Sequence, residues 1–266
     1  MTKKITHELM RHLDTLDVYV QLTTGEVVKA KGDRPTREGI YREAPAAAAR
    51  IQDVVRSAEG KVWLYASTSG QYASSDDLIG VRSTPNRAGE GLTYVVENLA
   101  ELGAMQLGEF EDPHIVLVPE LSPMRRAKAD DIALEAIKRK LKGEGAKKPA
   151  IEAAIVAYCA ANQFADPTTE SSDSIAGRYL QHIANSARHF NGLESGQEGA
   201  VLSMGHEPCL SLVLERLLGD RYQAIAAQGA VKTGDSIRFT MEQKAPGDVI
   251  QVRMQYHDVK HNYTIR

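Results

Sequence analysis

Short apolar runs that alternate with longer amphipathic stretches constrain the fold of this chain more than any other feature. Such runs cover residues 61–67, 114–119 and 200–204. A run of about four to eight apolar residues is typical of a strand buried on both faces, as in a parallel sheet. The intervening segments predict helices, at 40–58, 88–102, 129–141, 151–164, 174–190 and 208–218. We therefore expect an α/β fold in which helices cover both faces of a mostly parallel central sheet.

The two ends of the chain predict further strands. Residues 3–12 predict a first strand, and residues 18–22 and 26–30 flank Thr23-Thr24-Gly25 as the strands of a β-hairpin would. Residues 236–241 and 249–256 predict a closing antiparallel hairpin.

The segment 125–170 interrupts this alternation, because it contains two helical patterns in succession and no strand. The simplest interpretation is a helical insertion beside the sheet, which could cap a site. With 266 residues the chain is long enough to bury a full core. We expect a single domain over 1–266 that carries this insertion.

Composition and charge exclude several classes of protein. The net charge of −3 argues against a protein built to coat nucleic acid or an anionic membrane, and no apolar run is long enough to span a bilayer. Cys159 and Cys209 do not form a CxxC pair, so the chain has no zinc or redox motif of that kind. Each lies in an apolar helical stretch, which predicts a buried thiol and a reducing, cytoplasmic compartment. We expect no nucleic-acid partner and no membrane partner.

Two histidines lie where apolar stretches end. Arg11-His12 follows the predicted first strand, and His206 lies between the strand at 200–204 and the helix at 208–218. Such a position brings a side chain to the carboxyl edge of an open α/β sheet, where ligands bind. The sequence therefore predicts a site at this edge if the two histidines meet.

The residue types at these positions are suited to phosphoryl transfer. A neutral imidazole is a competent nucleophile near neutral pH, and a planar guanidinium can hold two phosphate oxygens at once. We expect His12 to attack, Arg11 to clamp the phosphoryl group and His206 to donate to the developing charge. Arg87 would supply a second guanidinium from the first turn of a helix.

Four motifs resemble those of the histidine phosphatase (phosphoglycerate mutase-like) superfamily, and they follow one another in that family's order. Met10-Arg11-His12-Leu13-Asp14-Thr15 resembles "RHGET", with Leu13 in place of the usual glycine. Arg34-Pro35-Thr36-Arg37-Glu38-Gly39 resembles "PLTxxGxxQA", and Ser83-Thr84-Pro85-Asn86-Arg87-Ala88 resembles "SSPxxRA". Met204-Gly205-His206-Glu207 resembles the late "GH" or "SH" motif. The chain thus looks like a divergent member of this superfamily.

The resemblance implies a phosphohistidine mechanism. His12 would become phosphorylated, while Arg11, Arg87 and His206 line the phosphate pocket. A carboxylic acid would protonate the leaving oxygen, and the position just after the strand at 114–119 indicates Glu120 for this role.

The resemblance also implies the class of reaction. The protein would be an enzyme, a metal-independent phosphomonoester phosphatase or, less favoured, a mutase, acting on a small phosphorylated molecule without a cofactor. Glu111 would be the second candidate for the acid, after Glu120.

Two alternatives lack this chemistry. Residues 6–16 could form an amphipathic helix with Arg11 and His12 exposed. Alternatively, residues 18–22 could be the first sheet strand, in which case Thr23-Thr24-Gly25-Glu26 takes the place of "RHGE" and the protein is an inactive pseudophosphatase that binds a ligand or a protein. The distance between the His12 and His206 rings distinguishes these readings, because one phosphoryl group must touch both imidazoles.

Overall fold

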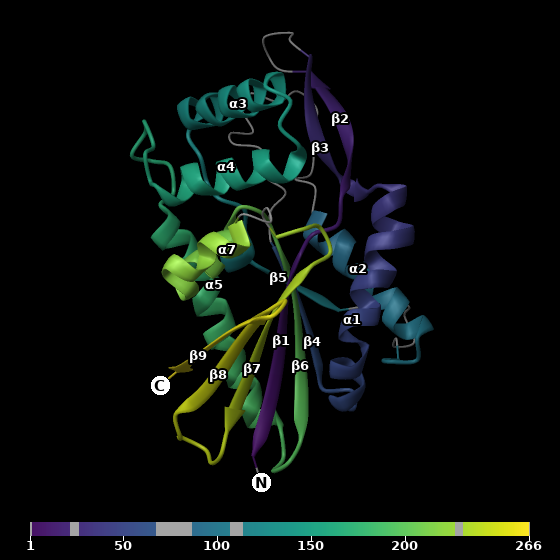
Figure 1. Ribbon diagram of the computed structural model, residues 1–266. Coiled ribbons are helices and arrows are strands. Elements are labelled where there is room, and N and C mark those ends of the chain that lie inside the picture. Colours follow the sequence, from purple (N-terminus) through teal and green to yellow (C-terminus); the bar gives the residue numbers. More distant parts are fainter. Residues whose placement is uncertain (1, 22–26, 68–86, 107–113, 227–230, 266) are drawn as a thin grey trace.

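The computed structural model describes residues 2–21, 27–67, 87–106, 114–226 and 231–265, and Figure 1 shows their arrangement. Within these ranges seven strands form one sheet in the order β5-β4-β6-β1-β7-β8-β9. The strands are β1 (Lys3–Arg11), β4 (Val62–Ser67), β5 (Ile115–Val118), β6 (Glu198–Gly205), β7 (Ser236–Gln243), β8 (Ile250–Tyr256) and β9 (Val259–Ile265).

The sheet is mostly, but not purely, parallel. Strands β5, β4, β6 and β1 are parallel neighbours, whereas β7, β8 and β9 follow as antiparallel neighbours. Strand β8 therefore runs in the same direction as β1, and only β7 and β9 oppose it. Strand β1 lies between β6 and β7, and its pairing with β6 runs from Lys4↔Glu198 to Arg11↔Gly205. This register brings the ends of the two strands side by side.

Helices cover both faces of the sheet, as the alternation of strands and helices predicts. One apolar cluster joins α1 (Ala44–Ser57) and α2 (Arg87–Glu101) to one face, through residues such as Met10 and Met204. A larger cluster joins α5 (Ser172–Asn185) and α6 (Cys209–Leu218) to the other face. The α/β architecture is confirmed.

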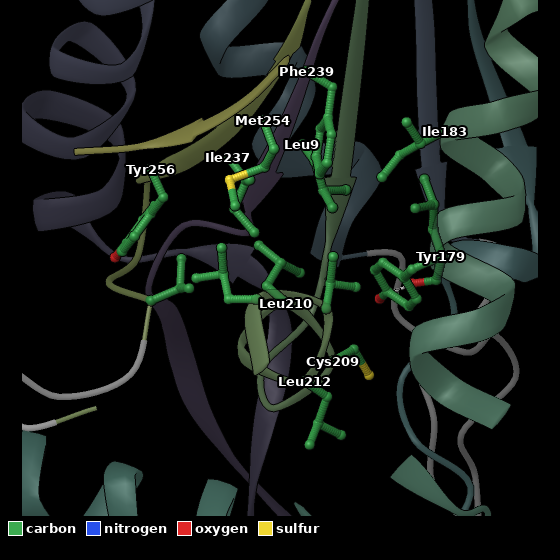
Figure 2. Packing of buried hydrophobic residues seen from close by; sticks show 14 of the residues in the cluster. Leu9, Tyr179, Ile183, Cys209, Leu210, Leu212, Ile237, Phe239, Met254 and Tyr256 are labelled. Atoms are coloured by element: carbon green, nitrogen blue, oxygen red, sulfur yellow. Dashed lines mark hydrogen bonds between the residues drawn. The ribbon is translucent and has the colours of Figure 1, made fainter. Parts of the chain in front are cut away.

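The larger cluster holds the middle of the sheet in place. Figure 2 shows Leu9, Ile237 and Phe239 of the strands packed among side chains from α5 and α6. Leu9 and Phe239 are fully buried, and burial of a side chain of this size stabilises a fold by about 1.5–3 kcal/mol. The two faces of β1 thus bury different residues, Leu9 on this face and Met10 on the other.

Two alternatives for the amino-terminal region are wrong. Residues 3–11 form a strand and not a helix, because neighbours on both sides complete the hydrogen bonds of the β1 backbone. Strands β2 (Thr15–Gln21) and β3 (Val27–Pro35) pair only with each other within the described residues, so 18–22 is not the first strand of the main sheet. The predicted hairpin is confirmed, although its turn lies outside the described residues.

The closing region contains one strand more than the sequence predicts. Strand β9 follows the expected hairpin and pairs with β8 from Ile250↔Ile265 to Tyr256↔Val259. It forms an edge of the sheet and exposes every second residue, so its sequence lacks the apolar run that marks the central strands. The α-helix predicted at 174–190 is shorter than expected. Helix α5 ends at Asn185, and a 3-10 helix follows at Ser186–Gly192.

The segment 125–170 contains the two predicted helices, α3 (Lys128–Gly143) and α4 (Lys148–Ala160). Figure 1 shows them, in teal, beyond the upper ends of β1 and β6, which are the carboxyl ends of these strands. The fully buried Asp130 carboxylate anchors the segment, because it accepts hydrogen bonds from the backbone N–H of Ala165 (2.8 Å) and from the Thr169 hydroxyl (2.6 Å). These hydrogen bonds lower the pKa of Asp130, mainly through Thr169.

Candidate active site

The two histidines singled out by the sequence lie together at the carboxyl edge of the sheet. The ring centroids of His12 and His206 are 5.0 Å apart, and the rings are tilted by 52°. The His12 backbone N–H donates to the Gly205 carbonyl at 3.0 Å, so the two strand ends are tied together at this point. The predicted approach of the two imidazoles is confirmed, and the distance is short enough for one phosphoryl group to contact both.

A hydrogen bond sets the orientation of the His12 ring. Its Nδ1 lies 2.7 Å from the carbonyl oxygen of Leu13. A carbonyl oxygen can only accept, so Nδ1 carries the hydrogen. In the neutral ring the lone pair is therefore on Nε2, which is the arrangement that a nucleophilic imidazole requires.

Arg11 is held beside these rings although it is almost fully buried. Only 8% of the residue is exposed. Its Nη1 donates to the carbonyl of Val231, and its Nη2 lies 3.1 Å from Oε1 of Glu152 in α4. Its buried Nε has no hydrogen-bond partner within the described parts of the chain. A buried charged donor of this kind favours an anionic ligand, because an unsatisfied buried donor costs free energy.

Gly205 and Tyr179 hold His206 in position. A Cβ atom on Gly205 would lie 2.8 Å from the ring of Tyr179, closer than such atoms approach, so only glycine fits here. The buried Tyr179 hydroxyl donates to the Leu121 carbonyl at 2.7 Å and accepts from the His206 backbone N–H at 3.3 Å. The glycine of the late motif thus allows α5 to support the loop that carries His206.

The early motif at 34–39 contacts the same edge of the sheet. The Thr36 backbone N–H donates to the carbonyl of Asp14 at 2.9 Å, and the Thr36 hydroxyl accepts from the Gly39 N–H at 3.0 Å. Glu43 accepts a hydrogen bond from the Asp14 N–H at 2.7 Å. These contacts fix the chain immediately after His12.

A cavity of about 970 Å³ opens over these residues. Its floor is formed by Arg11, His12 and His206, and its opposite wall comes from the segment 123–156, including α3 and α4. The volume is at the upper end of the range that is typical of small-molecule sites. The helices at 125–170 therefore form part of the site wall.

Glu207 is an acidic group of this cavity that the sequence-based reasoning did not assign. It follows His206 directly, lines the cavity, and accepts hydrogen bonds from the backbone N–H (3.3 Å) and the hydroxyl of Ser211. Burial raises the pKa of Glu207 to about 7, although Arg11 and the Ser211 hydrogen bonds oppose this shift. A carboxyl group with such a pKa can give up a proton near neutral pH. Its position next to His206 in the sequence was the signal that could have identified it.

The remaining predicted residues are not brought into the described site. Glu120 lies in a short 3-10 helix (Pro119–Leu121) after β5, and it is not among the described residues that line the cavity. Arg87 is the first residue of α2, and the placement of its side chain lies outside the description, as do Glu111 and residues 83–86. The roles predicted for Glu120 and Arg87 therefore stay predictions.

Within the described ranges, no group of three or more His, Cys, Asp or Glu side chains is arranged to hold a metal ion. No helix of the described chain is both long and apolar enough to cross a membrane.

No protein-family model matches the sequence, and no curated protein matches it. Solved structures do match. A phosphoglycerate mutase from Bacillus anthracis is 16% identical, with a TM-score of 0.51 over 90% of this chain and 88% of that one. This chain has the phosphoglycerate mutase-like fold.

Two mycobacterial structures support the same conclusion about the phosphoglycerate mutase-like fold. A glucosyl-3-phosphoglycerate phosphatase with bound inorganic phosphate is 13% identical, with a TM-score of 0.51 over 96% of this chain and 97% of that one. A protein described as mycobacterial hydrolase 1 is 14% identical, with a TM-score of 0.53 over 96% of this chain and 98% of that one. The chain therefore matches these proteins over nearly its whole length.

Glu152, like Glu207, is a cavity residue that the sequence-based reasoning did not assign, because no local pattern singles it out. It lies on α4, about 140 residues from Arg11 in sequence, and becomes part of the site only because the helices at 125–170 fold over the strand ends.

Proposed function

We propose that this protein is a phosphomonoester phosphatase that works through a phosphohistidine on His12. The observation that carries this proposal is the pair of imidazoles of His12 and His206, whose ring centroids are 5.0 Å apart, beside the buried guanidinium of Arg11. The phosphatase and the mutase with the same fold support the reaction class.

In the proposed first step, Nε2 of His12 attacks the phosphorus atom and the bond to the ester oxygen breaks. Arg11 and the buried His206 donate hydrogen bonds to the phosphoryl oxygens, where charge is concentrated in the transition state. In the second step water attacks the phosphohistidine, and inorganic phosphate leaves.

A carboxyl group must protonate the leaving ester oxygen in the first step and accept a proton from water in the second. Glu207 is better placed than Glu120 for this role, because it lines the cavity next to His206 and its pKa is raised to about 7. The proposed assignment therefore moves the acid from the strand end at Glu120 to the late motif.

Release of nitrophenol from p-nitrophenyl phosphate tests the proposal. The wild-type protein should turn over, and His12→Ala should lose about 10³-fold or more in kcat, as expected for loss of a nucleophile. Unchanged turnover in this variant would show that His12 is not the nucleophile. Phosphate binding without any turnover in the wild type would favour an inactive binding protein instead.

The identity of the acid is tested by comparing Glu207→Gln with Glu120→Gln. We expect the first to lower kcat by about 10²-fold or more, with a smaller effect on a substrate whose leaving group is a good one such as nitrophenolate. Glu120→Gln serves as the matched control and should stay within about threefold of wild type. The opposite ranking would return the assignment to Glu120.

A further inference from the structure

The charge balance around Arg11 is unusual for a pocket that receives a phosphate dianion. Its Nη2 lies 3.1 Å from the carboxylate of Glu152, and both side chains are mostly buried, with 10% and 21% exposed respectively. The guanidinium proposed to hold the phosphoryl group is therefore already paired with an anion from α4.

The two histidines and two further carboxyl groups share this space with Glu152. Asp14 and Glu207 line the same cavity as His12 and His206. Glu152 also contributes to the electrostatic field that disfavours the charged form of Glu207. Three carboxyl groups, those of Asp14, Glu152 and Glu207, thus line the same cavity as the two histidines.

The basic residues of α3 and its flanks that line the cavity are either paired with carboxylates or exposed. Arg126 pairs with Asp131 at 2.8 Å, and Lys138 pairs with Glu135. Lys142 and Lys148 also line the cavity, but they stand on exposed positions, where water screens their charges.

A phosphate oxygen that accepts from Nε of Arg11, which has no partner within the described residues, would lie next to the Glu152 carboxylate, because Nε and Nη2 are adjacent donors of one planar guanidinium. Two anionic oxygens at this distance repel each other in a site of low dielectric constant. A proton between them removes the repulsion, since a protonated phosphoryl oxygen donates a hydrogen bond to the carboxylate.

From this geometry we infer that Glu152 selects the singly charged form of the phosphate ligand, by accepting a hydrogen bond from its protonated oxygen. This inference rests on the proposed function, because it assumes that the phosphoryl group binds at Arg11. It makes α4 a positioning element of the site and assigns the ligand class as phosphate monoester monoanions. Phosphomonoesters lose their second proton at about pH 6, so the preference for the monoanion can be measured within a pH range in which proteins are commonly studied.

The test is the affinity for inorganic phosphate, measured by isothermal titration calorimetry from about pH 5.5 to about pH 8.5, a range in which the monoanion gives way to the dianion. The wild-type protein should bind phosphate at least about tenfold more weakly at the high pH than at the low pH. Glu152→Gln should bind at least about tenfold more tightly than wild type at the high pH, and within about threefold of it at the low pH.

Two controls keep the outcomes separate. Glu144→Gln changes an exposed residue at the end of α3 that is not among the cavity residues, and it should behave as wild type at both pH values. Circular dichroism of each variant reports whether the fold is retained.

Equal ratios of variant to wild-type affinity at both pH values, or weaker binding by Glu152→Gln at the high pH, would overturn the role of Glu152. If the wild type turns over p-nitrophenyl phosphate while either of these results is found, only this inference fails. If the wild type binds no phosphate at either pH, the proposed function fails together with it.

Discussion

Replacing Glu207 by glutamine should change how the stability of the protein depends on pH. The pKa of this carboxyl rises from 4.5 to about 7 on folding, chiefly because of burial. The folded protein therefore retains a proton that the unfolded chain loses. The contribution of Glu207 to stability is fully present below about pH 4.5 and is lost as the pH rises through about 7. Glutamine removes this titration and keeps a side-chain oxygen that accepts from Ser211.

The magnitude follows from the shift. One pKa unit corresponds to about 1.4 kcal/mol, so the whole shift represents about 3 kcal/mol. Between about pH 5 and pH 7 the linkage relation gives a change of about 2 kcal/mol. The free energy of unfolding of Glu207→Gln minus that of wild type should therefore increase by about 2 kcal/mol from pH 5 to pH 7.

Urea unfolding of both proteins at the two pH values, followed by circular dichroism, measures this difference. Other groups that titrate in this range are common to both proteins, so they cancel when the free energies are subtracted. Ser211→Ala provides a second perturbation, because its hydroxyl favours the charged carboxylate and its loss should raise the pKa further. A difference between Glu207→Gln and wild type that is the same at both pH values would refute the reasoning.

Three further predictions concern the supports of the site and of the core. Gly205→Ala should lower the free energy of unfolding in urea by about 1–3 kcal/mol, because the new methyl group would overlap Tyr179; an unchanged midpoint would contradict this. Tyr179→Phe should cost about 1–3 kcal/mol, since the Leu121 carbonyl loses its donor, and thermal unfolding would report it. The pKa of His182 is lowered by burial to about 4, so its contribution to stability is present above about pH 6.5 and is lost as the pH falls toward 4. His182→Gln, which can still bond to Ser203, should reduce the acid sensitivity of unfolding by about 2 kcal/mol between pH 7 and pH 5, and equal sensitivity would show that His182 does not titrate this way.

Much of the fold could be predicted because burial leaves a local pattern. The central strands β1, β4 and β6 are mostly buried, so they required the apolar runs that the sequence displays. Strand β5 was predicted from a similar run, but it is an edge strand of the described sheet, and Val116 and Leu117 are exposed. Strand β9 was not predicted, since an edge strand that exposes every second residue has no such run.

The site could be predicted only in part. His12 and His206 were identifiable because each ends a strand or a strand-like run, and strand ends are where α/β sheets bind ligands. Glu207 was not assigned although it follows His206 directly, and Glu152 was not assigned because a single glutamate in an apolar helix does not by itself mark a site. Only their burial and their common cavity with Arg11 mark them as site residues.

The sequence by itself determined the alternation of strands and helices, the order of the four motifs and the residue types at the strand ends. These properties are encoded within a few positions of each residue, through propensity and periodicity. The tertiary structure decided that β1 pairs with β6, so that His12 and His206 meet after a separation of nearly 200 residues. It also decided that α4 brings Glu152 to Arg11. Such contacts depend on the packing of whole elements against one another, and no short segment of the chain contains the information that fixes them.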